Sequence, residues 1–192
     1  MTLLDIINAY SNLQAIYGNV DSTFDVCSMY GKPKRCFVTN HTKCINFDNV
    51  KNDFNPNLKS VDSLYFSHRD NAVYFIEFKN SHYDNVHEDI VEKANDSILV
   101  HHQACQFPSY FSVDNIIVCV LSENKTMSHT NNLLSSYLKL SGYTTNASYL
   151  SFLESKFAQS FFAFVGTTRL PFMYNTFKIV FDTSFDSFVL SI

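Results

Sequence analysis

The sequence lacks the features of a membrane protein or of a disulfide-bonded secreted protein. No stretch reaches the roughly 18 uninterrupted apolar residues that a membrane helix needs, and the start, from Met1 to Ile7, has no basic segment typical of a signal peptide. Its five cysteines, an odd number at irregular spacing, favour free thiols over a disulfide framework. We therefore expect a soluble cytoplasmic protein with no membrane partner.

Tryptophan is also absent, but Phe and Tyr are abundant and apolar residues make up 46% of the 192 residues, which argues against disorder. A chain of this length can bury a substantial core and fits one domain better than two. We expect a single domain over residues 1–192, with a core over about residues 1–121 and a C-terminal extension over about residues 122–192.

Overall positive charge is missing too, since the net charge is −4, and this argues against a binder that attracts nucleic acid through its whole surface. One stretch is nevertheless rich in cations and poor in acids, and it contains Lys32, Lys34, Arg35, Lys43, Lys51 and Lys59. This stretch could form a basic rim beside a nucleic-acid site, or simply a solvated loop region.

Hydrophobic periodicity predicts an α/β protein built on a mixed sheet. Apolar residues at three- and four-residue steps indicate helices, and short β-rich runs between turn residues indicate strands. The expected helices are Leu3 to Tyr17, ended by Gly18, then His87 to Gln106, Asn131 to Leu140 and Ala147 to Phe164. The expected strands are short pieces between Asp21 and Lys59, including Cys36 to Val38 and Cys44 to Phe47, then Val61 to Phe66, Ala72 to Phe78, Asn115 to Leu121, Phe177 to Phe181 and Ser187 to Ile192.

The polar link between Val61–Phe66 and Ala72–Phe78 predicts a hairpin that brings two acids together. In the register that pairs Phe66 with Val73, Asp62 faces Glu77 across the strands. Lys79 lies on the same face as Glu77, two residues further on. The strand is apolar enough to be interior, where unpartnered carboxylates are costly, so a cation should accompany them.

Two carboxylates with one lysine leave a negative charge that a divalent cation would relieve. Oxygen ligands favour Mg²⁺ or Mn²⁺, which keep several waters and accept phosphate oxygens. Such an arrangement suits phosphodiester hydrolysis, with Lys79 orienting the attacking water or offsetting developing charge. A purely structural trio, in which the lysine only neutralises the acids and fixes the register, is the alternative.

The runs Val61-Asp62-Ser63-Leu64-Tyr65-Phe66 and Tyr74-Phe75-Ile76-Glu77-Phe78-Lys79 resemble the PD-(D/E)XK nuclease superfamily, whose pattern is an acid opening one strand and Glu-Xaa-Lys on the next. The resemblance covers roughly Leu3 to Leu121. It implies a restriction-endonuclease-like core in the order α-β-β-β-α-β, followed here by a C-terminal helical and strand extension. Small endonucleases of segmented negative-strand RNA viruses and stand-alone nucleases of phage and bacterial defence share this layout, and the sequence does not choose between them.

Carried over residue by residue, the resemblance implies metal binding by Asp62, Glu77 and the Phe78 carbonyl, with Lys79 as the catalytic lysine. It also implies a site residue on the following helix, for which Lys93 and Gln103 are the candidates. Many members have a further acid or histidine upstream. For that position Asp5, His41 and Asp48 remain open. Val61 stands where the family often has proline, a position that shapes backbone and binds nothing.

Other constellations carry less weight. Cys27, Cys36, His41 and Cys44 could hold zinc, but the close cysteine pairs of common zinc modules are absent. His101 and Cys105 share a helical face and are expected to pack or cap. The Phe-rich segment from Phe157 to Phe164 is expected in the core or at an oligomer interface, such as that of a homodimer.

The sequence thus predicts a Mg²⁺- or Mn²⁺-dependent nuclease that hydrolyses DNA or RNA phosphodiester bonds. The runner-up is a catalytically inactive module of the same fold that binds nucleic acid or a protein partner.

Overall fold

The computed structural model describes residues 1–81, 87–106 (backbone only at 87–88), 108, 111–126, 128, 151–152, 155 and 174–192. The helices are α1 (Leu3–Tyr17), α2 (Phe24–Cys27), α3 (Phe47–Phe54), α4 (His87–Ala104), the 3-10 turn η2 (Asp182–Ser184) and α7 (Phe185–Ser191). The strands are β1 (Asp21–Thr23), β2 (Met29–Tyr30), β3 (Arg35–Cys36), β4 (Lys43–Asn46), β5 (Ser63–Ser67), β6 (Ala72–Lys79), β7 (Asp114–Leu121) and β8 (Thr176–Phe181).

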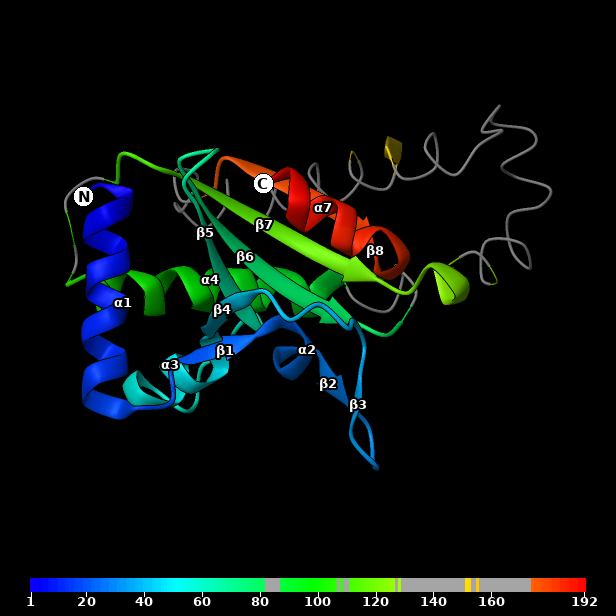
Figure 1. Cartoon of the computed structure of the whole chain (residues 1–192), viewed down its shortest axis with the longest axis horizontal. Coiled ribbons are helices and arrows are strands. Elements are labelled where there is room, and N and C mark those ends of the chain that lie inside the picture. The colour runs from blue at the N-terminus through cyan, green and yellow to red at the C-terminus, as the bar shows by residue number, and fades with distance from the viewer. Residues whose placement is uncertain are drawn as a thin grey trace.

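A six-stranded mixed sheet in the order β1-β4-β5-β6-β7-β8 forms the centre of the fold (Figure 1). Neighbouring strands from β1 to β6 pair antiparallel, whereas β6, β7 and β8 pair in parallel. The expectation of an α/β protein with a mixed central sheet is therefore confirmed. Strands β2 and β3 form a separate two-stranded hairpin.

Helices cover both faces of the sheet. Strand β6 accordingly carries apolar side chains on both of its faces. Val73 and Phe75 face one core cluster, which also takes side chains from α1, α3 and α4. Tyr74 and Ile76 face the other cluster, together with side chains from α2 and α7. Figure 1 shows α7 in front of the sheet and α4 crossing behind it. Glu77 follows the alternation and lies on the α4 side.

Helix α1 has the boundaries that its sequence predicts, because both ends are capped. Thr2 and Asp5 form a reciprocal capping box at the start, and Gly18 ends the helix at φ 74°, a left-handed conformation that glycine adopts without strain. Leu3, Ile6 and Tyr10 are buried on one face.

The hairpin of β5 and β6 has the predicted register. Phe66 pairs with Val73 and Ser63 pairs with Ile76. The expected long helix and the buried strand that follows it are present as α4 and β7, and the expected strand over Phe177 to Phe181 is present as β8.

Four local expectations differ from the structure, wholly or in part. Residues 187–192 were expected as a strand but lie mostly in α7, where Phe185, Val189 and Ile192 are buried at helical spacing on the far side from α4. The stretch between Asp21 and Lys59 contains helices α2 and α3 as well as strands. Cys44 to Phe47 is split, because Asn46 ends the strand and its side chain caps α3 by accepting from the Asn49 N–H.

The strand expected over Cys36 to Val38 is shorter and earlier, since β3 pairs only Arg35 and Cys36 with β2. The helix expected over 131–140, most of the helix expected over 147–164 and the Phe-rich segment 157–164 lie outside the described residues. Within the described ranges, none of the helices is long and apolar enough to cross a membrane.

Candidate active site

Asp62 and Glu77 meet on the α4 side of the sheet. Asp62 directly precedes β5, one residue before Ser63, whose pairing with Ile76 is the last of the hairpin ladder. The Asp62 Oδ2 atom accepts a 2.6 Å hydrogen bond from the backbone N–H of Phe78. This bond ties the acid of one strand to the Glu-Xaa-Lys segment of the other.

Glu77 is a buried carboxylate held by two lysines. Only 1% of it is exposed, and its Oε1 atom lies 2.8 Å from Lys93 Nζ and 2.9 Å from Lys79 Nζ. The other oxygen, Oε2, is buried and has no hydrogen-bond partner in the part of the chain that the structure describes. An ionised oxygen without a partner is costly in such a place, so this atom is available to a further cation.

Lys93, rather than Gln103, is the residue that α4 contributes. Its Nζ lies 3.9 Å from Asp62 Oδ1 as well as against Glu77, so one ammonium group faces both carboxylates. Gln103 is ten residues further along the same helix, which places it about 15 Å away at the helical rise.

Lys79 has a second partner that the sequence did not reveal, the carboxylate of Asp89 on α4. Its Nζ donates to Asp89 Oδ2 at 2.5 Å. Asp89 also lies 3.4 Å from Lys59, whose ammonium group contacts Glu92 at 2.6 Å. The sequence feature that could have identified Asp89 is its spacing from Lys93, because an acid and a base four residues apart lie on one helical face.

Burial and charge shift the pKa values of the acids in opposite directions. Burial, followed by repulsion from Glu77, raises the pKa of Asp62 well above its ordinary value of 3.8. Burial also raises the pKa of Glu77, against the attraction of Lys93 and Lys79. Asp89 is more exposed. Burial acts to raise its pKa, but the hydrogen bond from Lys79 and the charge of that lysine outweigh burial, so the pKa of Asp89 is lowered.

Both lysines of the cluster stay charged. Burial acts to lower the pKa values of Lys79 and Lys93, but the attraction of Glu77 and of the second acid beside each lysine outweighs it. The pKa of each is therefore raised, and each supplies a fixed positive charge at neutral pH.

Among the three upstream candidates, Asp48 is the one placed toward the site. It lies in the first turn of α3, its Oδ1 accepts from Ser60 Oγ at 2.5 Å, and its charge contributes to the raised pKa of Asp62. Asp5 is used in the α1 capping box. His41 lies 3.2 Å from Asp25 instead.

The donor set suits a hydrated Mg²⁺ or Mn²⁺ better than a metal held by side chains alone. Asp62, Glu77 and a backbone carbonyl such as that of Phe78 are oxygen ligands of the kind these ions prefer, with water completing the shell. Among the described residues, no three His, Cys, Asp or Glu side chains group so as to hold a metal ion. The contact that Phe78 makes here is through its N–H.

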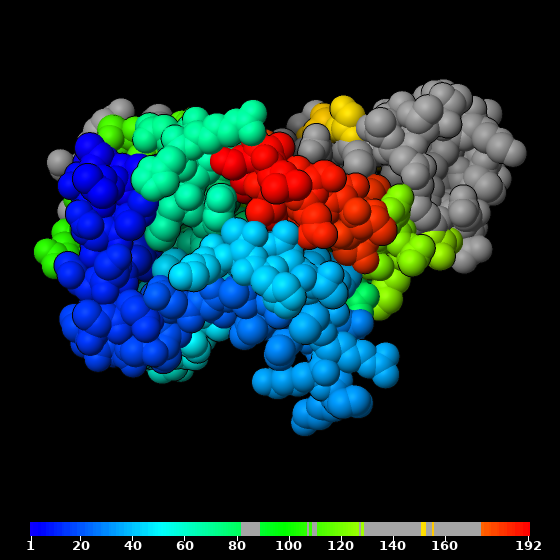
Figure 2. All heavy atoms as spheres, in the orientation of Figure 1, coloured from blue at the N-terminus to red at the C-terminus, as the bar shows by residue number. Residues whose placement is uncertain are grey.

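The basic stretch does not form one surface. Lys32, Lys34 and Arg35 are exposed around the β2–β3 hairpin, which projects from the body of the protein (Figures 1 and 2). Lys59, by contrast, forms ion pairs with Asp89 and Glu92. Phe24 of α2, just before the hairpin, packs against Phe78 with ring centroids 6.2 Å apart, which is at the same end of β6 as the acids but on the face opposite α4.

Two other candidate sites from the sequence, at His101 and at the four possible zinc ligands, do not form functional clusters in the described structure. His101 is buried, and its Nδ1 lies 2.9 Å from the Tyr10 hydroxyl, which joins α4 to α1. Burial lowers the pKa of His101 to about 3, so it is neutral. The four zinc candidates are dispersed: Cys36 is exposed on β3 and His41 faces Asp25, while only Cys27 and Cys44 are together.

Comparison with known proteins finds no relative of this chain: no family model, no curated protein and no solved structure matches it.

Proposed function

We propose that this chain is a divalent-metal-dependent nuclease of the PD-(D/E)XK type, with a restriction-endonuclease-like core. One observation carries the proposal: Asp62 and Glu77, from adjacent strands, face the same Lys93 ammonium group, and Lys79 stands beside Glu77. Two acids and a lysine in this arrangement are what the resemblance implies for an active site.

The order of elements supports the same assignment. Helix α1, the antiparallel strands β4, β5 and β6, helix α4 and the parallel strand β7 occur in the order α-β-β-β-α-β, with β1, α2, β2 and β3 inserted before β4 and α3 inserted after it. The acids lie on the face that α4 covers. The Lys93 side chain reaches them from that helix.

In this proposal Asp62, Glu77 and the Phe78 carbonyl hold one Mg²⁺ or Mn²⁺. Such an ion, when bound, would supply polarisation of the phosphodiester and a lowered pKa for a bound water. Lys79 holds the attacking water or offsets charge that develops on the phosphate, and Asp89 keeps its ammonium group in place. Lys93 neutralises the acids in the metal-free protein and would face a phosphate bound beside them.

A second function, a binding module without catalysis, is favoured by a different observation. Each acid of the cluster already faces an ammonium group, at distances of 2.5 to 3.9 Å, so each acid has a cationic partner without a metal. A closed network of this kind can serve only to fix the packing of α4 on the sheet.

Calorimetric titration with Mn²⁺, paired with digestion of single- and double-stranded DNA and RNA, tests the choice. The unaltered protein should bind Mn²⁺ and cleave at least one substrate, and Glu77→Gln should weaken Mn²⁺ binding at least tenfold and abolish cleavage. Asp114→Asn is the matched control, because Asp114 is an exposed acid paired with Ala72 at the opposite end of β6. Indifference of the unaltered protein to Mn²⁺ would favour the binding module.

A further inference from the structure

Two thiols outside the acidic cluster lie close together. Cys27 is in α2 and Cys44 is on β4, and their sulfur atoms are 3.7 Å apart. Both cysteines are free in this structure. A separation of this size is a hydrogen-bond distance between sulfurs, so a disulfide bond of about 2.0 Å requires the two side chains to move closer together.

The surroundings of the pair make the two thiols unequal. Cys44 is buried, whereas Cys27 is partly exposed and so is the sulfur that a dissolved reagent meets first. The two sulfurs share a hydrogen bond in which either atom can donate, and this contact lowers the pKa of Cys27 and raises that of Cys44. A thiol with a lowered pKa has more of the reactive thiolate at neutral pH.

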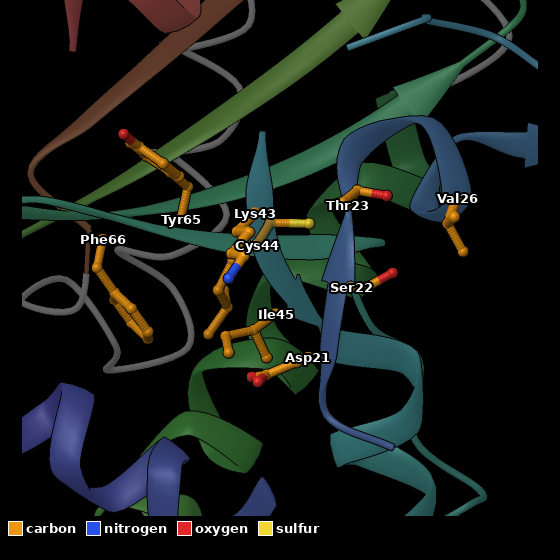
Figure 3. A pocket seen from close by; sticks show the side chains of 10 residues that line it. Asp21, Ser22, Thr23, Val26, Lys43, Cys44, Ile45, Tyr65 and Phe66 are labelled. Atoms are coloured by element: carbon orange, nitrogen blue, oxygen red, sulfur yellow. The ribbon is translucent and has the colours of Figure 1, made fainter. Parts of the chain in front are cut away.

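A hollow in the surface lies beside the pair. Its volume is about 630 Å³, and it is lined by Cys44, Ser22 and Val26 among others, but not by Cys27 itself. In Figure 3 the Cys44 sulfur points toward the side on which Thr23 and Val26 lie.

We propose that Cys27 and Cys44 are a reversible thiol–disulfide exchange site, which low-molecular-weight disulfides such as oxidised glutathione convert into an intramolecular disulfide. The Cys27 thiolate attacks one sulfur of glutathione disulfide, forms a mixed disulfide and releases one glutathione thiolate. Cys44 then loses its proton to water and attacks the Cys27 sulfur, which releases the second glutathione. Two protein thiols are oxidised, and one glutathione disulfide is reduced to two thiols.

The expected consequence is a clamp between α2 and β4. The bond would close a loop between residues 17 apart in sequence and restrict the unfolded chain, which raises the thermal midpoint Tm by about 5 °C. This site is independent of the proposed nuclease chemistry.

The test uses full-length Cys36→Ser protein, which removes the exposed thiol and leaves four of the five cysteines. After incubation with oxidised glutathione and removal of excess reagent, thiols are counted with a maleimide under denaturing conditions, and peptides are mapped by mass spectrometry. We expect two reactive thiols instead of four, a Cys27–Cys44 cross-linked peptide, a higher Tm and full reversal by a phosphine reductant.

Two further variants in the Cys36→Ser background identify the attacking sulfur. With Cys44→Ser, Cys27 should stop at a glutathione adduct, and with Cys27→Ser, Cys44 should stay reduced at least tenfold longer. The proposal is overturned if the Cys36→Ser protein keeps four thiols in excess oxidised glutathione, or if its end product is the Cys27 adduct. Neither of those outcomes depends on a variant at the buried pair.

Discussion

The carboxylate of Asp62 accepts a 2.6 Å hydrogen bond from the backbone N–H of Phe78, the residue between Glu77 and Lys79. The side chain of the first acid is thereby fixed by the backbone that presents the second acid and the lysine. An amide oxygen could accept the same bond, so Asp62→Asn removes the charge while keeping the contact.

The charge of Asp62 predicts a specific pH dependence. Because burial and Glu77 raise its folded-state pKa, its contribution to stability is fully present below its ordinary pKa of 3.8 and is lost as the pH rises through the raised value. Thermal melts of the metal-free protein should therefore lose Tm from about pH 4 upward. Asp62→Asn should flatten this decline, and an unchanged slope would contradict the burial of this charge.

Binding of Mn²⁺ should raise Tm and so oppose the decline of Tm with rising pH. A metal competes with protons for Asp62 and Glu77, so Mn²⁺ should raise Tm more at pH 7.5 than at pH 5.5. In Asp62→Asn the rise should be nearly absent at both values. An equal rise in both proteins would place the metal elsewhere.

Lys79→Ala separates catalysis from packing. Breaking a buried pair costs about 3–5 kcal/mol when the remaining charge has no partner. Glu77 keeps Lys93 at 2.8 Å, so we expect a smaller loss of about 1–2 kcal/mol in the free energy of unfolding. Mn²⁺ affinity should be unchanged or higher because a positive charge is removed, while cleavage is lost. A variant that unfolds readily and ignores Mn²⁺ would instead support the binding module.

Ser97 on α4 should help to position Asp62. Its Oγ accepts a 2.9 Å bond from the backbone N–H of Val61, in a buried place. Ser97→Ala leaves that N–H without its acceptor and should cost about 1–3 kcal/mol in urea unfolding. Ser11→Ala is the control, since the Ser11 hydroxyl bonds to the Ile7 carbonyl on the exposed side of α1, and it should change stability by less than about 0.5 kcal/mol.

Nucleic-acid binding should depend on the β2–β3 hairpin. Lys34→Glu should weaken binding and reduce the slope of log K against log salt by about one phosphate contact, which is about 0.7 to 0.9. Arg69→Glu makes the same charge reversal in an exposed turn at the other end of β5 and β6 and should leave the slope unchanged. Equal effects of the two variants would indicate a nonspecific response to net charge.

The hairpin and its acid pair could be predicted from the sequence because their pairing is local. Alternating apolar residues and a short turn determine which residues face each other, and the register of Phe66 with Val73 follows. The choice between Lys93 and Gln103 could not be made, because it depends on where α4 crosses the sheet, and Asp89 was missed for the same reason.

Short apolar segments were the weakest part of the prediction. The C-terminal run containing Val189 and Ile192 fits either a strand or a helix, and burial of Phe185 at helical spacing from Val189 resolves it as α7. Helix α3 was hidden by its polar surface residues, although Phe47 and Val50 are buried one turn apart.

The short turn between Ser67 and Ala72 also bears on the order in which the chain can fold. Closing this turn costs little chain entropy, whereas pairing β6 with β7 must wait for the whole segment that contains α4. Asp62 and Glu77 can therefore meet while water still solvates them, and Lys93 arrives only when α4 docks. Docking of α4 would then neutralise an acidic pair that already exists, so its rate should be sensitive to ionic strength.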